Sequence, residues 1–344
     1  PVTTNTLSEI VVGIPALLAP SLGMGLFFLI AGYFTPGSYD RKGAASFLRG
    51  RLLRLGIPLL LYDLLVDPLV VYIASGNHES IWSFYGPYLL QARTIGPGVA
   101  WFIATLLIFN LLYAAWRWLG KKLTRTGTRS ADLPNYKAIL GFIIALGLAI
   151  FVVRIWLPIK LEGLPTWWVQ LFNIPGGGGF LPQYISFFVL GCTASRHNWF
   201  VALTPKMGRD WSLIALVVII GIIPFILLGI AAGMQPADYL GGFHWQALLE
   251  AECEAFLDVG LCIGALVLFH QCWNRQGGLT KALADSAYAV YLISSLLIVS
   301  VAQVFSTEAL YPLLKFIIVL LLVLPLSFLV GLILHKIPVA NRIF

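Results

Sequence analysis

The chain has 344 residues, of which 59% are hydrophobic and only 11% are charged. Soluble globular proteins carry about a quarter charged residues, so most of the surface of this chain is unsuited to contact with water. The composition therefore excludes a soluble globular enzyme, a disordered chain and a disulfide-rich secreted module. In a membrane protein, the formal net charge of +7 is better explained by orientation in the membrane than by nucleic-acid binding. No nucleic-acid partner is therefore expected.

Nine apolar segments are near or above the roughly 20 residues that a helix needs to cross a bilayer. We predict transmembrane helices over residues 7–34, 55–75, 98–118, 138–157, 180–195, 212–233, 244–270, 282–305 and 312–335. The strands of a membrane barrel would instead show alternating segments of about ten residues. The predicted fold is an all-α, polytopic membrane bundle, formed by a single domain over residues 1–344.

The basic residues lie almost entirely on one side of this predicted bundle. All but four of the 22 Lys and Arg residues fall in the odd-numbered connections or in the C-terminal tail, and the exceptions are Arg93, Arg154, Lys160 and Lys315. Because basic residues are retained on the cytoplasmic side, we predict a multi-pass protein of the cytoplasmic (inner) membrane with a cytoplasmic C-terminus.

Nine helices and a cytoplasmic C-terminus place the N-terminus outside. The sequence begins at Pro1, without an initiator Met and without a cleavable signal sequence before it. We therefore expect one further helix upstream of Pro1, which would bring the bundle to ten helices. The alternatives are a processed N-terminus, or one helix miscounted around Pro15 and Pro20.

A cluster of basic residues precedes the second predicted helix and consists of Arg41, Lys42, Arg49, Arg51 and Arg54. Arg51 and Arg54 are three residues apart, so on a helical turn they project from the same face. Two guanidinium groups on one face suit the bidentate binding of phosphate. The alternative is attachment to anionic lipid, at about 1 kcal/mol for each residue, and the spacing alone favours this alternative.

Four acidic residues lie in the seventh predicted helix: Glu250, Glu252, Glu254 and Asp258. Glu250, Glu254 and Asp258 recur every four residues and form one stripe. Ionised carboxylates within hydrocarbon cost several kcal/mol, so they are expected to face a wet cavity or a cation. The stripe either lines a path for a substrate or a proton, or is solvated near the outer interface. The spacing does not decide between the two.

Other chemical signatures are weak. None of the five histidines pairs with another His or a Glu at zinc-binding spacing, and the four cysteines also lack metal-ligand spacing, so no metal is expected. No Gly-x-Ser-x-Gly elbow or Ser-His-Asp set is visible. The outer connections 76–97 and 158–180 are candidates for contact with an external substrate.

Several segments, in order along nearly the whole chain, are similar to the membrane-bound acyltransferase family 3. They are Met24 to Gly43, Phe47 to Pro58, Gly96 to Phe102, Leu181 to Gly191, His244 to Ala247, Asn274 to Gly277 and Ala287 to Ile293. The resemblance implies a ten-helix core that takes an acyl group from cytoplasmic acyl-CoA and passes it to a glycan or other hydroxyl acceptor outside. The implied partners are acyl-CoA, this acceptor and the membrane lipids.

The resemblance also implies a donor site. Arg51 and Arg54 match the family's Arg-x-x-Arg motif, which is associated with binding the phosphates of coenzyme A. This implication reverses the preference for lipid that the spacing alone gives. Arg41 and Lys42, in the same cluster, are expected to contribute to the site.

A second set of residues is implied for the substrate path. Glu254 falls where this branch of the family carries an acidic residue, and we expect it to support catalysis. Trp101 belongs to the Trp-Phe signature that opens the third predicted helix. Together with Glu250 and Asp258, Trp101 is expected to line the path.

The chain departs from the family pattern at the catalytic group. The family's catalytic His lies on its first helix, which would precede Pro1, and relatives carry a His where this chain has Ser294 and an acid where it has Ala104. Serine cannot replace imidazole as a general base near neutral pH. Two functions therefore remain open: an acyl-CoA-dependent acyltransferase, or a catalytically degenerate member that acts as a structural subunit with other membrane proteins. A transporter is a third alternative, supported by the acidic stripe alone.

Overall fold

The computed structural model describes residues 23–76, 80–90, 98–120, 133–159, 178–272, 277–308 and 310–336, and within these ranges every regular element is helical. The longer helices are α2 (Gly25–Lys42), α3 (Ala44–Arg51), α5 (Asp67–Ala74), α6 (Ile81–Leu90), α7 (Trp101–Gly120), α8 (Tyr136–Trp156), α10 (Leu181–His197), α12 (Pro205–Ala231), α13 (Trp245–Cys272), α14 (Gly278–Val304) and α15 (Pro312–His335). The shorter ones are α4 (Ile57–Leu61), α11 (Trp199–Ala202), the π-helical turns η2 (Leu52–Gly56) and η3 (Tyr62–Val66), and the 3₁₀ turns η4 (Gly98–Ala100) and η6 (Pro236–Tyr239).

Seven helical stretches in the described part of the chain are long and apolar enough to cross a membrane. They are Ala44–Ala74, Gly98–Gly120, Tyr136–Trp156, Pro205–Ala231, Trp245–Cys272, Gly278–Val304 and Pro312–Leu334. They correspond to seven of the nine predicted segments and confirm an all-α, multi-pass membrane protein. The other two predictions fall on α2, whose last turn is charged, and on α10, which has 17 residues. Residues 7–22 of the first predicted segment lie outside the described residues.

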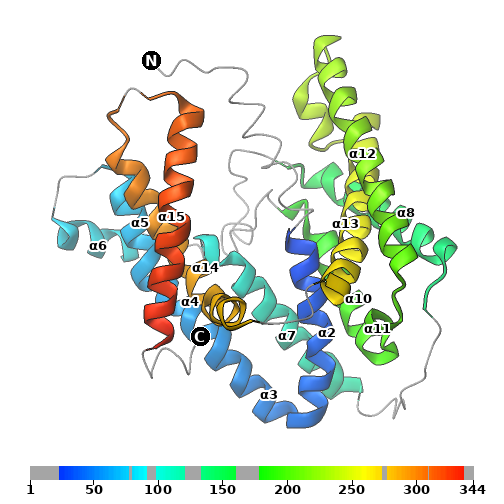
Figure 1. Cartoon of the computed structure of the whole chain (residues 1–344), viewed down its shortest axis with the longest axis horizontal. Helices are drawn as coiled ribbons and strands as arrows, with labels where there is room; N and C mark the ends of the chain where they lie inside the picture. Colours follow the sequence, from blue (N-terminus) through cyan, green and yellow to red (C-terminus); the bar gives the residue numbers. More distant parts are fainter. Residues whose placement is uncertain are drawn as a thin grey trace.

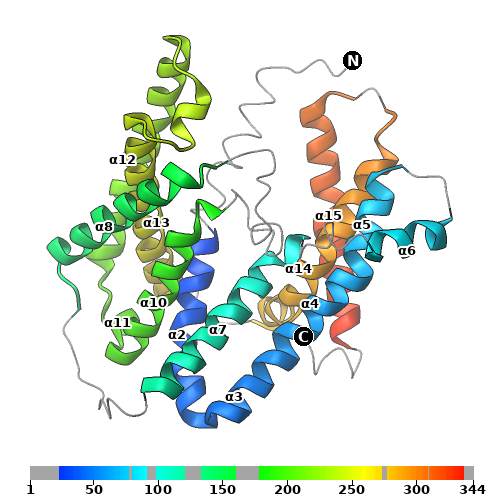
Figure 2. The same ribbon diagram turned by 180° about the vertical axis from the view of Figure 1, so that it is seen from behind.

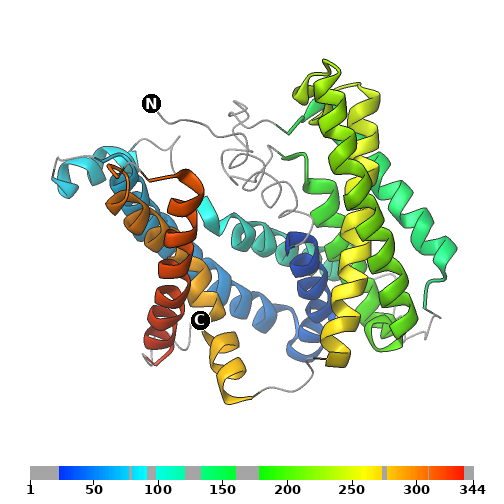
Figure 3. The same cartoon turned by 45° about the horizontal axis from the view of Figure 1, so that its top comes forward.

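The helices form two groups with α7 between them (Figure 1 and, from behind, Figure 2). In one group α2 packs on α10, and α13 packs on both α8 and α12; in the other, α14 packs on α5 and α15. The helix α7 contacts α2 and α3, and Phe102 near its start meets Tyr291 of α14, with ring centroids 6.5 Å apart. Figure 3 shows the same division with the top of the molecule turned forward.

The helix that begins at Ala44 corrects the predicted start at residue 55. It runs without a break to Ala74, so Arg49, Arg51 and Arg54 lie within it rather than before it, whereas Arg41 and Lys42 end α2. Hydropathy misses this start because the first turns are polar, although Ala, Leu and Arg all favour helix.

Two prolines shape this long helix. A proline lacks the N–H that would bond the carbonyl four residues earlier, so Pro58 leaves the Arg54 carbonyl free, and the Tyr288 hydroxyl of α14 donates to it at 3.0 Å. Pro68 likewise frees the Leu64 carbonyl, which accepts a hydrogen bond from the Tyr85 hydroxyl of α6. The π-helical turns η2 and η3 lie at these two places.

The helices α2 and α10 are in backbone contact through two glycines. A Cβ atom on Gly32 would lie 2.2 Å from the Phe188 carbonyl oxygen, and one on Gly191 would lie 2.1 Å from the Leu29 carbonyl oxygen. Small residues at such contacts are typical of helix pairs in membranes. The close approach brings Phe28 of α2 and Phe188 of α10 against Phe109 of α7, with ring centroids 5.3 and 5.2 Å away.

Candidate functional site

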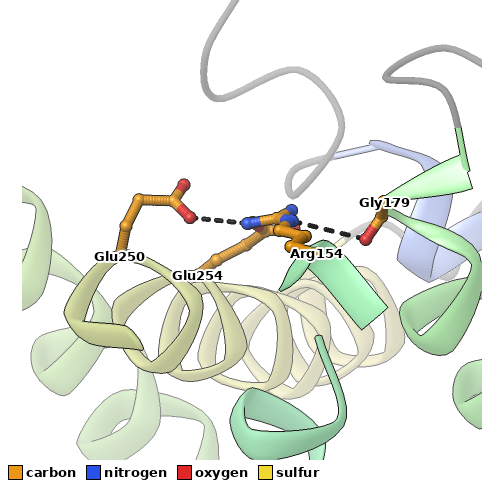
Figure 4. Close-up of polar contacts among 4 residues, drawn as sticks. All are labelled: Arg154, Gly179, Glu250 and Glu254. Carbon is orange, nitrogen blue, oxygen red and sulfur yellow. Dashed lines mark hydrogen bonds and ion pairs between the residues drawn. The ribbon is translucent and has the colours of Figure 1, made fainter. Parts of the chain in front are cut away.

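The largest fully buried side chain in the described residues is that of Arg154, in the last turn of α8. Its side chain is 0% exposed. Its Nη1 and Nη2 atoms donate to Oε2 of Glu250 at 2.5 Å and to Oε2 of Glu254 at 2.6 Å, and its Nε donates to the Gly179 carbonyl at 3.3 Å (Figure 4). All three guanidinium nitrogens therefore have partners, and the group is held in one orientation.

The loop before α13 brings these carboxylates to Arg154. The Gly242 N–H donates to the Arg154 carbonyl at 2.9 Å, and the Ile159 N–H donates to the Leu240 carbonyl at 2.8 Å. Gly241 has a φ of +151°, and a Cβ atom there would lie 2.5 Å from Cβ of Pro158, so only glycine fits this close approach. The end of α8 is thus fixed to the start of α13.

The acidic stripe continues inward from this pair. Glu254 is 5% exposed and Asp258, one turn further along α13, is 0% exposed, which does not fit the alternative in which the stripe is solvated. Burying charges costs several kcal/mol for each ion unless they are paired. Arg154 offsets this cost for Glu250 and Glu254. Oε1 of Glu254 is buried and has no hydrogen-bond partner among the described residues, so it is an unused hydrogen-bond acceptor.

A row of aromatic rings connects the ion pairs to Trp101. The Arg154 guanidinium lies 5.0 Å from the ring centroid of Phe180, within the range of a cation–π interaction. Phe180 lies 6.2 Å from Tyr184, and Tyr184 lies 5.4 Å from Trp101, all between ring centroids. The charges of Glu254 and Asp258 also act on Tyr184. The predicted path residues therefore lie in one region of the fold.

The predicted donor residues lie elsewhere, on α2 and α3 at the opposite end of the molecule (Figure 1). Arg41 and Lys42 end α2, which turns into α3 at Gly43 with a φ of +73°. Arg51 ends α3, half-buried with its guanidinium 5.2 Å from the Phe47 ring centroid. Arg54 follows in η2.

These predicted donor residues are not neutralised by an acid in the described part of the chain. Arg41, Lys42 and Arg54 are exposed, and across the described ranges no carboxylate pairs with any of the four basic residues. We call this set the basic corner (Arg41, Lys42, Arg51 and Arg54). Four cations without counter-ions at one end of a membrane protein suit a polyanionic ligand.

The two positions that depart from the family pattern carry no proton chemistry. Ala104 is buried in α7, and the Ser294 hydroxyl donates to the Tyr291 carbonyl of its own helix at 2.9 Å. In the described part of the chain, no three His, Cys, Asp or Glu side chains are grouped so that they could hold a metal ion.

Sequence reasoning missed Arg154 as the partner of the acidic stripe. Its signal was present, because Arg154 is a charge within an apolar segment and is one of the four basic residues that fall outside the connections predicted to be cytoplasmic. Its distance of 100 residues from Glu254 hides the pairing. Most of the two candidate outer connections, residues 77–79, 91–97 and 160–177, lie outside the described residues.

The chain was compared with known proteins. A family model described as an acyltransferase domain matches residues 6–332. Relatives include proteins named "Glucans biosynthesis protein C" from Escherichia coli strains SMS-3-5 and K12 / DH10B and from Escherichia coli O9:H4 strain HS. Each is 24% identical over 290 residues, which cover 79% of this chain and 68% of the relative. No solved structure matches the chain.

Proposed function

Because the chain belongs to the acyltransferase 3 family, whose domain covers residues 6–332, we propose that it transfers an acyl group from cytoplasmic acyl-CoA to a hydroxyl acceptor on the other side of the membrane. The family match confirms the resemblance found in the sequence. The observation that carries the proposal is the presence of two polar sites at opposite ends of one membrane bundle, the basic corner and the Arg154 ion pairs. A reaction with its donor and acceptor on different sides requires two such sites.

The basic corner is the proposed donor site. Arg51 and Arg54 would bind the phosphates of acyl-CoA, and Arg41 and Lys42 would add to the positive field. Charge-assisted hydrogen bonds of this kind contribute about 1.5–3 kcal/mol each. The apolar interior of the bundle would then admit the thioester arm.

The Arg154 site is the proposed acceptor site. Arg154 holds one oxygen of Glu254, so Oε1 of the same carboxylate is oriented to accept a hydrogen bond from an acceptor hydroxyl. A base takes the hydroxyl proton as the hydroxyl oxygen attacks the thioester carbonyl, the C–S bond breaks, and the base returns the proton to the coenzyme A thiolate, which leaves as the thiol. The family resemblance implies that this base is a His of the family's first helix. Glu250, Asp258 and Trp101 would line the approach.

The acceptor is proposed to be a glycan. The support comes from the relatives, whose name assigns them to the biosynthesis of glucans. A carboxylate held by a guanidinium beside aromatic rings is also suited to sugar hydroxyls and to the apolar faces of sugar rings.

The donor site is tested by the binding of radiolabelled acetyl-CoA to the purified protein. The double variant Arg51→Gln/Arg54→Gln should raise the Kd by at least tenfold, because it removes two charge-assisted contacts. The control is Arg49→Gln, which removes an exposed positive charge from the same helix and should leave the Kd within twofold. Equal Kd values for the double variant and the control would refute the donor site.

The orientation is tested with the native cysteines. Cys272, at the end of α13, is exposed, whereas Cys192 and Cys253 are half-buried and Cys262 is buried. In the proposed orientation, with the C-terminus and the basic corner in the cytoplasm, a membrane-impermeant maleimide should label Cys272 in inverted vesicles and not in intact cells. Labelling in intact cells would place the basic corner outside and overturn the donor assignment.

A second candidate function is that of a structural subunit without catalysis. The observations that favour it are the buried Ala104 and the Ser294 hydroxyl, which is engaged within its own helix. The two candidates differ in one experiment. The purified chain, alone in vesicles, should transfer labelled acetyl groups if it is an enzyme. Absence of transfer, together with co-purification of other membrane proteins at fixed stoichiometry, would establish the subunit.

A further inference from the structure

A groove between α7 and α10 has no part in the proposed transfer. It has a volume of about 380 Å³ and is lined almost wholly by apolar atoms. Leu112 and Trp116 of α7 and Ile185 and Val189 of α10 lie along it and are exposed. Such a surface is suited to hydrocarbon rather than to water.

The groove runs along both helices in the same direction. Phe109 meets Phe188 at 5.2 Å between ring centroids, and further along Tyr113 meets Arg196. From Ile185 to Arg196 the lining covers about 16 Å of helix at 1.5 Å per residue. This length is close to half of the roughly 30 Å hydrocarbon core of a bilayer, so the groove matches the depth of one leaflet.

One end of the groove carries a cation. The half-buried Arg196 guanidinium donates from Nη2 to the Tyr113 hydroxyl at 3.2 Å. Arg117 pairs with Asp40 and Arg154 with Glu254. No carboxylate of the described residues pairs with Arg196. Its charge is therefore available to an anion at the end of an apolar channel.

We propose that this groove binds an anionic phospholipid, with one acyl chain between α7 and α10 and the headgroup phosphate paired with Arg196. The apolar length fits a chain of one leaflet, and the cation lies where the headgroup of that leaflet would be. In the orientation proposed above, this is the cytoplasmic leaflet. The site itself depends on neither the orientation nor acyl transfer.

The test measures lipid retention by the purified protein in nanodiscs that contain equal amounts of phosphatidylglycerol and phosphatidylcholine. Native mass spectrometry after release counts the lipids that stay bound. The wild type should retain phosphatidylglycerol in preference to phosphatidylcholine. Arg196→Gln should lower this preference about fivefold, since a basic residue near a membrane surface contributes about 1 kcal/mol to binding anionic lipid. Arg196→Lys, which keeps the charge, should restore most of it.

Two further variants separate the site from general attraction by positive charge. Arg209→Gln removes the same charge from an exposed position of α12 and should leave the preference unchanged. Val189→Trp fills the groove and should reduce the retention of both lipids. Equal retention of the two lipids by the wild type, or an unchanged preference in Arg196→Gln, would overturn the proposal. The groove would then be occupied by the lipids that surround the protein, without selection of the headgroup. Since acyl-CoA is absent from this assay, neither result bears on the proposed transfer.

Discussion

Substitution of Arg154 by methionine keeps a long side chain and removes its charge. In the native protein the guanidinium is fully buried, 2.5 Å from Glu250 and 2.6 Å from Glu254. Removal of one partner of a buried ion pair costs about 3–5 kcal/mol, because the other charge stays buried without compensation. Two carboxylates lose their partner here, so we expect Arg154→Met to reach the upper part of that range.

The matched control is Arg117→Met. Arg117 forms an ion pair of similar length, 2.7 Å, with Asp40, but the two side chains are 27% and 47% exposed. Exposed pairs contribute about 0–1 kcal/mol. The assay is thermal unfolding in detergent micelles, followed by tryptophan fluorescence. Arg154→Met should lower the Tm by on the order of 10 °C, and Arg117→Met by a few degrees at most.

A compensating variant tests the cause of the loss. If uncompensated charge destabilises Arg154→Met, neutralising both acids in Arg154→Met/Glu250→Gln/Glu254→Gln should recover part of the Tm, because buried neutral groups cost less than buried ions. The reasoning is refuted if Arg154→Met and Arg117→Met lower the Tm equally, or if the triple variant is no more stable than Arg154→Met.

Two other predictions concern single contacts. In the same unfolding assay, Gly32→Ala should destabilise the protein by at least about 1–3 kcal/mol, because its Cβ would lie 2.2 Å from the Phe188 carbonyl oxygen. The control is Gly37→Ala on the same helix, where no atom lies within 4 Å of the new Cβ, and it should stabilise the protein by up to about 1 kcal/mol. Tyr88→Phe should cost about 1–3 kcal/mol, because it removes the 2.6 Å hydrogen bond to buried Asp67. Burial and this bond raise the pKa of the Tyr88 phenol above its usual 10.0, so the bond contributes fully below about pH 10, and its contribution is lost progressively as the pH rises from there to the raised pKa. A Tm difference from wild type that stays unchanged over this rise in pH would contradict the assignment.

The membrane helices were predictable because hydropathy over about 20 residues is a strong local signal. It located the seven spanning helices, including α12 and α15. It failed where the local signal is weak. The helix start at Ala44 is polar, and α6 is a short aromatic helix within a predicted outer connection. Pro58 and Pro68 are a local signal for the turns η2 and η3, but the tyrosine hydroxyls that bond the freed carbonyls come from α14 and α6, and no local pattern reveals these partners.

The site was predictable in part. The spacing of Glu250, Glu254 and Asp258 predicted one stripe, and the structure has them on α13, with Glu254 and Asp258 buried. The cost of burying carboxylates predicted a cation or a wet cavity, and a cation is present. Its identity as Arg154 depends on how the loop at Gly241 joins α8 to α13, which is a property of the tertiary fold. The roles of Arg51 and Arg54 stay predictions.

The two π-helical turns set the angular phase of the long helix. Each accommodates one residue more than an α-helical turn, and one residue corresponds to about 100° of rotation. Deletion of a single residue within Leu52–Gly56 would let this stretch relax into an ordinary α-helix. Arg51 would then keep its direction relative to Asp67, because the turn loses only the residue that it had accommodated. A deletion within the α-helical part of the stretch would instead turn Arg51 by about 100° around the axis relative to Asp67.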